Sequence, residues 1–158
     1  MLLSPKKVKF RKQRKGKGQL NVLRGQRKRI HKASSAYSLD VGDYGLKALE
    51  PGRLSAAQIE AARRVMMRKM KSSAPSQKRQ GKLVVRIFPD VPVTKKPTEV
   101  RMGKGKGTLS FWSTKILSGR ILFEFDGITK ELAMELAHSG NAKLPIATKL
   151  VYRRAIAG

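Results

Sequence analysis

A seven-residue run of glycine and cations lies between two strand-like segments, at Arg101-Met102-Gly103-Lys104-Gly105-Lys106-Gly107. Glycine lets the backbone adopt positive φ and lets its N–H groups approach an anion without a Cβ in the way. The Lys and Arg side chains add charge that is not neutralised near pH 7. The run therefore predicts a tight loop suited to phosphate, with strands expected at 98–101 and 109–116 on either side of it.

Two nucleotide-binding patterns are missing from this loop. Its glycines do not have the G-x-G-x-x-G spacing, and no G-x-x-x-x-G-K-[ST] sequence surrounds them, so free nucleotide is not expected. The remaining alternative is a solvated hairpin tip. The net charge favours binding: 36 Lys and Arg against 10 Asp and Glu give +26 on 158 residues, and such self-repulsion destabilises a compact state unless a polyanion neutralises it.

Nucleic acid is the expected polyanion. No apolar stretch approaches the roughly 18 residues that a membrane-spanning helix needs, so no membrane partner is expected. Residues 1–39 carry thirteen Lys or Arg and no acidic residue, and they cannot bury enough apolar surface to fold alone. We expect them to be an extension that orders on RNA; a cleaved leader is the alternative, but it would need an amphipathic face that the glycines interrupt.

The rest of the chain suits one domain, at 40–152, followed by a short tail at 153–158, because 40% apolar residues support a single modest core. A capping box of Ser55 and Gln58, with Leu54 stapled to Ile59, predicts the start of a helix. Glu60 is expected to pair with Arg64. The apolar stripe of this helix should pack on the core, and its basic face should meet solvent or RNA; the stripe is Ile59, Ala62, Met66 and Met70, and the basic face is Arg64, Arg68 and Lys71.

Strands are also expected at 82–88, 119–127 and 146–152, and a second helix should begin at Thr129 and end at Gly140. The stretch 71–77 is read as a surface loop. Pro92 and Pro97 should keep their segment out of any central ladder. Several strands with two helices and no regular β-α-β alternation predict an α+β fold, with a mostly antiparallel sheet, two packed helices and a basic extended N-terminal tail.

No catalytic constellation is evident. The chain has no cysteine, and its two histidines, His31 and His138, have no companions that would make a metal or catalytic site. Glu124 and Asp126 share one face of a predicted strand and could be read as a hydrolase pair, but beside so many cations they are expected to be ion-pair partners. We therefore expect no enzyme activity, no cofactor, no metal and no small-molecule substrate; a phosphate-binding hydrolase would instead show measurable nucleotide binding.

Six motifs in order carry a resemblance to a known family, at 9–12, 45–51, 53–64, 85–90, 101–107 and 142–146. Together they resemble the bacterial-type sixteenth protein of the large ribosomal subunit, over most of the chain from Lys6 to about Tyr152. The resemblance implies an α+β protein seated on large-subunit rRNA beside the A-site tRNA and neighbouring ribosomal proteins. In that family the glycine-lysine loop and the basic N-terminal segment reach toward the peptidyl transferase centre and the tRNA.

Carried over by position, the RNA-contacting residues come from three segments: Lys6, Lys7, Lys9, Arg11, Lys12, Arg14, Lys15 and Lys17 in the tail; Arg63, Arg64 and Arg68 on the first helix; and Arg101, Met102, Gly103, Lys104, Gly105, Lys106 and Gly107 in the loop. The family also has an aromatic pair where Phe111 and Trp112 stand, which implies core packing rather than base stacking.

Two departures from the family pattern bear on the source. Residues 71–77 look inserted, and the stretch between Gly18 and Tyr44 looks longer and more basic than usual. These features favour a mitochondrial ribosome, with a plastid or the bacterial cytoplasm as alternatives. A free-standing RNA-binding or assembly factor is the rival functional class, and it should dissociate from mature subunits.

Overall fold

The computed structural model describes residues 4–13, 36–73, 81–103 and 105–153. Two helices and seven strands follow one another in the order β1 (Tyr44–Ala48), β2 (Gly52–Ser55), α1 (Ala56–Ser73), β3 (Lys82–Val85), β4 (Val91–Lys95), β5 (Thr108–Ile116), β6 (Ile121–Asp126), α2 (Lys130–Asn141) and β7 (Thr148–Tyr152). The α+β class is confirmed.

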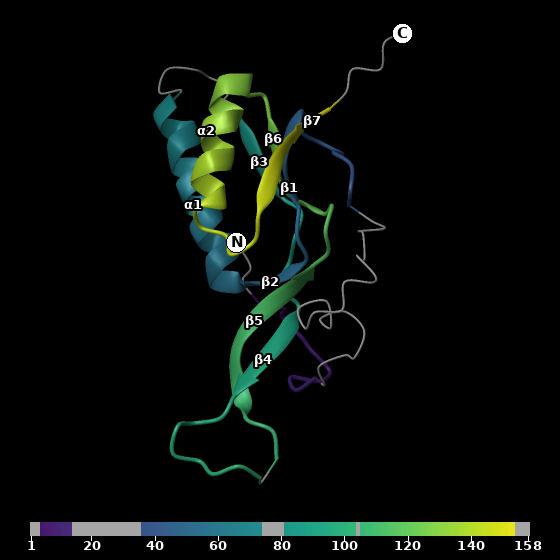
Figure 1. Ribbon diagram of the computed structural model, residues 1–158, viewed down its shortest axis with the longest axis vertical. Helices are drawn as coiled ribbons and strands as arrows, with labels where there is room; N and C mark the ends of the chain where they lie inside the picture. Colours follow the sequence, from purple (N-terminus) through teal and green to yellow (C-terminus); the bar gives the residue numbers. More distant parts are fainter. Residues whose placement is uncertain (1–3, 14–35, 74–80, 104, 154–158) are drawn as a thin grey trace.

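The strands form two antiparallel sheets rather than the one expected. A four-stranded sheet has the order β3-β6-β1-β7, and a three-stranded sheet has the order β2-β5-β4. Figure 1 shows α1 and α2 side by side along the four-stranded sheet, while β4 and β5 extend away from it as a hairpin. The hairpin therefore holds its connecting loop away from the helical layer.

The core lies between the helices and the four-stranded sheet. β6 is a central strand with five of its six residues buried, and the predicted apolar stripe of α1 is buried as well. Thr129 caps the start of α2, and its hydroxyl accepts from the Leu132 N–H, as expected. It does not end at Gly140: this glycine is buried inside the helix, and a Cβ there would lie 2.9 Å from the Met66 sulfur. Gly140 thus allows close packing of α2 on α1.

The start of α1 follows the capping-box prediction. The Gln58 N–H donates to Ser55 Oγ at 3.2 Å, and the Ser55 N–H donates to Gln58 Oε1 at 2.9 Å. The end of α1 does not follow the prediction, because the helix continues through Lys71 to Ser73 where a loop was expected. No helix breaker precedes Pro75, so the helix can run on until that proline approaches. The rest of the expected 71–77 loop lies outside the described residues.

Two expected strands differ in the structure. The expected buried strand at 82–88 is only Lys82–Val85, and it lies half-buried at a sheet edge. The expected strand at 98–101 does not form; instead the Val100 N–H donates to the Pro97 carbonyl in a turn. The partner of β5 is β4, an edge strand, where Pro92 is tolerated because its missing N–H interrupts no central ladder.

The aromatic pair on β5 is not core packing as a whole. Trp112 is half-buried, but Phe111 is 45% exposed. Neighbouring residues of a strand point to opposite faces, and this end of β5 lies beyond the main core, so the two rings cannot share one environment. The core-packing prediction is therefore wrong for Phe111.

Candidate nucleic-acid interface

The glycine-lysine loop occupies the tip of the β4–β5 hairpin (Figure 1). It is longer than the sequence indicated, because it spans residues 96–107 once 98–101 is recognised as part of it. Arg101 and Lys106 are exposed, and Met102 is fully exposed. Lys104 lies outside the described residues. The loop thus presents cations and an apolar side chain at the protein surface.

Glycine is required in this loop for two different reasons. Gly103 and Gly105 have φ angles of 102° and 84°, which L side chains rarely adopt, although open space surrounds both. At Gly107 the constraint is contact, because a Cβ there would lie 2.5 Å from the Lys95 carbonyl oxygen. Gly107 therefore lets the two arms of the hairpin close at the base of the loop.

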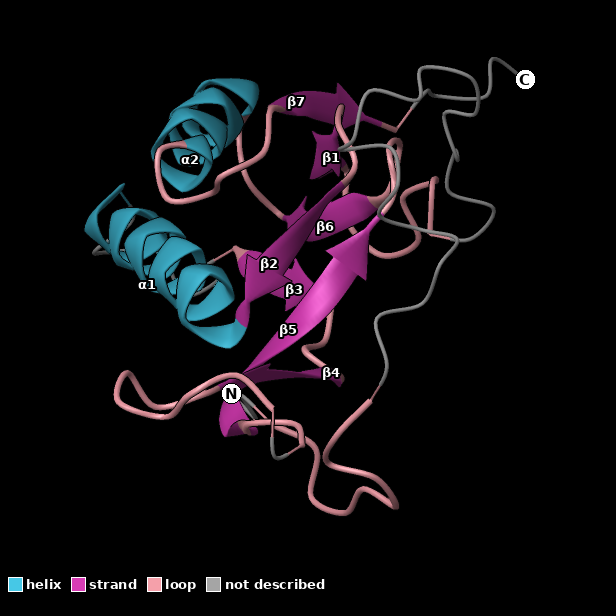
Figure 2. Cartoon of the chain, turned by 60° about the horizontal axis from the view of Figure 1, so that its bottom comes forward, coloured by secondary structure: helices cyan, strands magenta, loops and turns pink. Residues whose placement is uncertain are grey.

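The N-terminal segment lies against this loop. Lys12 Nζ donates to the Lys106 carbonyl oxygen at 3.2 Å, and Lys106 Nζ donates to the Gln13 carbonyl oxygen. Within the loop, Lys96 Nζ donates to the Gly103 carbonyl. Figure 2 brings this end of the molecule forward. Two of the three predicted RNA-contacting segments, far apart in the sequence, therefore form one basic surface.

The cations of that segment are available to a ligand where the structure describes them. Five side chains are exposed: Lys6, Lys7, Lys9, Arg11 and Lys12. Arg14, Lys15 and Lys17 lie outside the described residues. The carbonyl-directed hydrogen bonds of Lys12 and Lys106 hold charge close together without neutralising it, which favours an anionic partner at this surface.

The cations of α1 form a separate surface. Arg63 and Arg64 both bind Glu60, at 2.7 and 3.0 Å, and their side chains are 28% and 73% exposed. Arg68 is exposed. The expected Glu60–Arg64 pair is confirmed, and Arg63 adds a second, two-point contact. The structure does not bring these three arginines to the loop, since α1 lies along the other sheet (Figure 1).

The Glu60 carboxylate stays ionised in acid. Its hydrogen bonds from Arg63, reinforced by Arg64, outweigh partial burial and lower its pKa from the usual 4.5 to about 2. The same contact raises the pKa of Arg63. Glu60 thereby holds two arginine side chains along one turn of α1, which lowers the side-chain entropy that either would lose on binding a ligand.

Glu124 is a structural anchor and not half of a hydrolase pair. Its buried carboxylate pairs with Arg86 and accepts the N–H groups of Asp40, Val41 and Gly42. Burial opposes its ionisation, but these three N–H groups and the Arg86 charge prevail and lower its pKa. Arg86 also pairs with Asp40. The expectation that Glu124 serves in an ion pair is confirmed.

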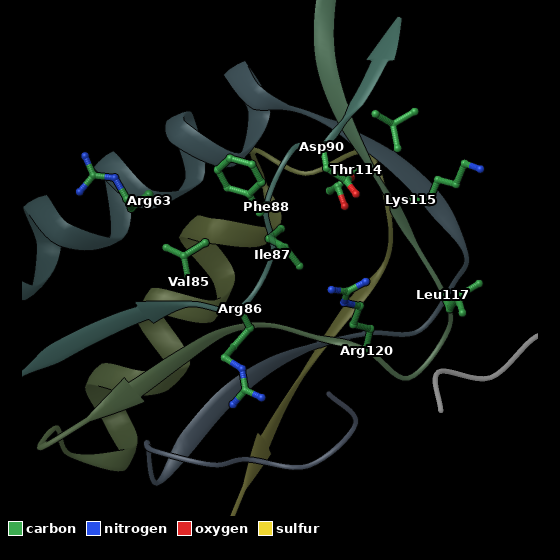
Figure 3. A pocket seen from close by; sticks show the side chains of 11 residues that line it. Arg63, Val85, Arg86, Ile87, Phe88, Asp90, Thr114, Lys115, Leu117 and Arg120 are labelled. Atoms are coloured by element: carbon green, nitrogen blue, oxygen red, sulfur yellow. The ribbon is translucent and has the colours of Figure 1, made fainter. Parts of the chain in front are cut away.

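A cleft that the sequence did not reveal lies between α1, β5 and the segment after β3 (Figure 3). Its volume is about 1070 Å³. Four cations line it, Arg63, Arg86, Lys115 and Arg120, with Phe88 and Asp90. These residues come from separate segments and share no spacing in the chain, so only the 85–90 motif pointed to this region.

No described helix is both long and apolar enough to cross a membrane. No three His, Asp or Glu side chains in the described ranges lie together as ligands for a metal ion.

Comparisons with known proteins agree on one family. The family model described as ribosomal protein L16p/L10e matches residues 5–151. The chain is 52% identical to the large ribosomal subunit protein uL16 of Caulobacter vibrioides (strain NA1000 / CB15N), with 96% of this chain and 94% of the relative aligned. It is 50% identical to uL16 of Chelativorans sp. (strain BNC1) and 48% identical to that of Paracoccus denitrificans (strain Pd 1222), each over 96% of this chain and 98% of the relative.

Proposed function

The chain belongs to the L16p/L10e family of ribosomal proteins, and we propose that it is a structural constituent of the large ribosomal subunit that binds rRNA and helps to position tRNA at the A site. As a member of this family it is a ribosomal protein and not an enzyme. The observation that carries the finer proposal is the joining of the N-terminal segment to the glycine-lysine loop through Lys12, Gln13 and Lys106.

The loop has the chemistry to hold an RNA backbone in place. Its glycines give close approach, Arg101 can contact a phosphate with two parallel N–H groups, and Met102 offers an apolar surface to a base or ribose. Such contacts orient an RNA without reading its sequence. We therefore assign the loop to positioning.

Incorporation into the subunit is tested by co-sedimentation. The protein should run with mature large subunits in stoichiometric amount after a moderate-salt wash. A free-standing assembly factor would be found only in the free pool or in immature particles. Isolated binding to rRNA should fall with salt, by roughly 0.7 to 0.9 in log K per log salt for each phosphate neutralised.

The tRNA contact is tested in purified ribosomes carrying Arg101→Ala, Lys104→Ala and Lys106→Ala together. Other basic surfaces should still bring this variant into subunits, while A-site tRNA accommodation slows or its occupancy falls. Wild-type tRNA affinity and peptide-transfer rate in these ribosomes would show that the loop is only a solvated hairpin.

The mitochondrial ribosome remains the proposed location, on the strength of the basic stretch before Tyr44 and the added residues at 71–77. Fractionation of the source cells decides this point. The protein should co-sediment with ribosomes prepared from mitochondria; recovery with plastid ribosomes, or from a bacterial cytoplasm, would assign it there instead.

A further inference from the structure

The cleft of about 1070 Å³ contains one arginine that no carboxylate engages within the described part of the chain. Of its arginines, Arg63 is bound by Glu60 and Arg86 by Glu124 and Asp40. Arg120 instead points into the middle of the cleft (Figure 3). Its Nε is buried and has no acceptor among the described residues. The buried Nε is itself closed to a ligand, but the terminal guanidinium nitrogens are directed into the cleft (Figure 3), where an anion can reach their charge.

Two further groups on the cleft walls suit a nucleobase. Phe88 lies across the cleft from Arg120 in Figure 3 and is 41% exposed, so part of its ring is open to a ligand. Asp90 lines the same cleft, is exposed, and forms no ion pair with any cation in the described ranges, although Lys115 and Arg120 share the lining. An aromatic face, an unengaged carboxylate and a phosphate-binding cation are the three parts of a nucleotide site.

We propose that this cleft binds a single unpaired nucleotide of RNA, with its phosphate on Arg120 and Lys115 and its base against Phe88. The Asp90 carboxylate accepts a hydrogen bond from an exocyclic amino group, such as those of adenine, cytosine and guanine. Uracil has no amino group, and carbonyl oxygens flank its N–H, so Asp90 disfavours it. This inference rests on the proposed function for the source of the RNA, since a ribosomal protein meets large-subunit rRNA.

The shape of the site favours one nucleotide over a duplex or a peptide. A cavity near 1000 Å³ holds a small ligand, whereas an RNA helix is convex and is met by an exposed surface. An acidic peptide would satisfy Arg120 and Lys115, but the Asp90 carboxylate would repel it. RNA offers both the anion for the arginine and the amino donor for the carboxylate.

The test is a titration of the full-length chain with mononucleotides, followed by amide NMR. Adenosine 5′-monophosphate should shift the amides of residues 86–88, 90 and 114–120 saturably at moderate salt. Uridine 5′-monophosphate should bind several-fold more weakly, and ribose 5-phosphate weaker still. Because the titration needs no ribosome, its failure leaves the subunit co-sedimentation result untouched, and failure of co-sedimentation leaves the cleft a nucleotide site.

Three variants and one control make the assignment specific. Phe88→Ala should weaken the binding of adenosine 5′-monophosphate about tenfold. The difference in affinity between this probe and ribose 5-phosphate should shrink. Arg120→Gln should weaken every phosphate-bearing probe about tenfold. Asp90→Asn should reduce the difference in affinity between adenosine 5′-monophosphate and uridine 5′-monophosphate. Lys143→Gln removes one exposed cation outside the cleft and should change none of these values.

Two outcomes would overturn the proposal. In the first, the shifts spread over all exposed cations and Arg120→Gln and Lys143→Gln have equal effects, which would mean only non-specific attraction to a basic protein. In the second, no probe binds, while Asp90→Asn and Arg120→Gln destabilise the fold equally and non-additively. Asp90 and Arg120 would then be partners of each other rather than of a ligand.

Discussion

Arg86 and Glu124 form an ion pair in which the carboxylate is fully buried and the guanidinium side chain is 18% exposed. Arg86 follows β3, and its own N–H donates to the Leu122 carbonyl at 2.9 Å, so the pair extends the β3–β6 ladder. The other side of the carboxylate takes N–H groups from the segment that enters β1. One side chain thus joins the edge of the sheet to the start of the folded domain.

We predict that Glu124→Gln lowers the free energy of unfolding by about 3 to 5 kcal/mol, the usual cost of breaking a buried pair. The amide NH₂ would face backbone N–H groups that require an acceptor. Urea unfolding measures the loss. Glu99→Gln, at an exposed turn position, is the matched control and should stay within about 0.5 kcal/mol of wild type. Equal stability of the two variants would refute the anchoring role.

Glu60 should make stability depend on pH in the acid range. Its folded pKa of about 2 lies below the usual 4.5, so the native state binds fewer protons than the unfolded state between these values. The contribution is present above pH 4.5 and is lost as pH falls toward 2. Between pH 5 and pH 3, the free energy of unfolding of wild type should fall by about 1 to 2 kcal/mol more than that of Glu60→Gln. This range allows for solvent screening of the exposed Arg64. An equal loss of unfolding free energy in wild type and in Glu60→Gln between pH 5 and pH 3 would contradict this.

The two kinds of loop glycine should respond differently to alanine. At Gly105 the cost is backbone strain alone, about 1 to 2 kcal/mol, because nothing lies within 4 Å of the added Cβ. At Gly107 the Cβ meets the Lys95 backbone, which cannot yield without moving β4. Amide exchange at Thr108 and Lys95 should therefore accelerate strongly in Gly107→Ala and little in Gly105→Ala. The reverse order would mean that the hairpin does not close at Gly107.

Lys106 should contribute to the salt dependence of RNA binding. If its ammonium contacts a phosphate, Lys106→Gln should make the fall of log K for RNA binding with log salt less steep, by roughly 0.7 to 0.9. The same change removes the hydrogen bond from Lys106 Nζ to the Gln13 carbonyl but leaves the bond from Lys12 Nζ to the carbonyl of residue 106, so the N-terminal segment should loosen without detaching. Lys143→Gln, away from the loop, should leave the slope unchanged. An unchanged slope in Lys106→Gln would place this cation outside the RNA contact.

The sequence predicted the features that depend on residues three or four positions apart. Ser55 and Gln58 are three residues apart, as are Thr129 and Leu132, so a single turn of helix is enough to specify each cap. The Glu60–Arg64 pair likewise follows from helical spacing. These features do not depend on the rest of the fold.

Features set by distant pairing could not be read in this way. The four-stranded sheet joins β1 to β6 and β7, which lie more than 70 positions further along the chain, and no local pattern shows these partners. The Gly42–Glu124 hydrogen bond spans 82 positions. Arg120 and Phe88 reach one cleft only after both sheets have formed. The exposure of Phe111 does not follow from the sequence either, since its apolar character alone favours burial.

Strand β5 is anchored in the domain at one end only. Ser113, Thr114 and Ile116 are buried, while Thr108 and Ser110 near the loop are exposed, so the domain encloses one end of β5 and the loop projects from the other. The loop lies a full hairpin length away from this anchored end. A small change in backbone direction at Thr114 would therefore displace the loop by a larger distance. A substitution near Thr114 could thus change the position of the loop without itself contacting nucleic acid.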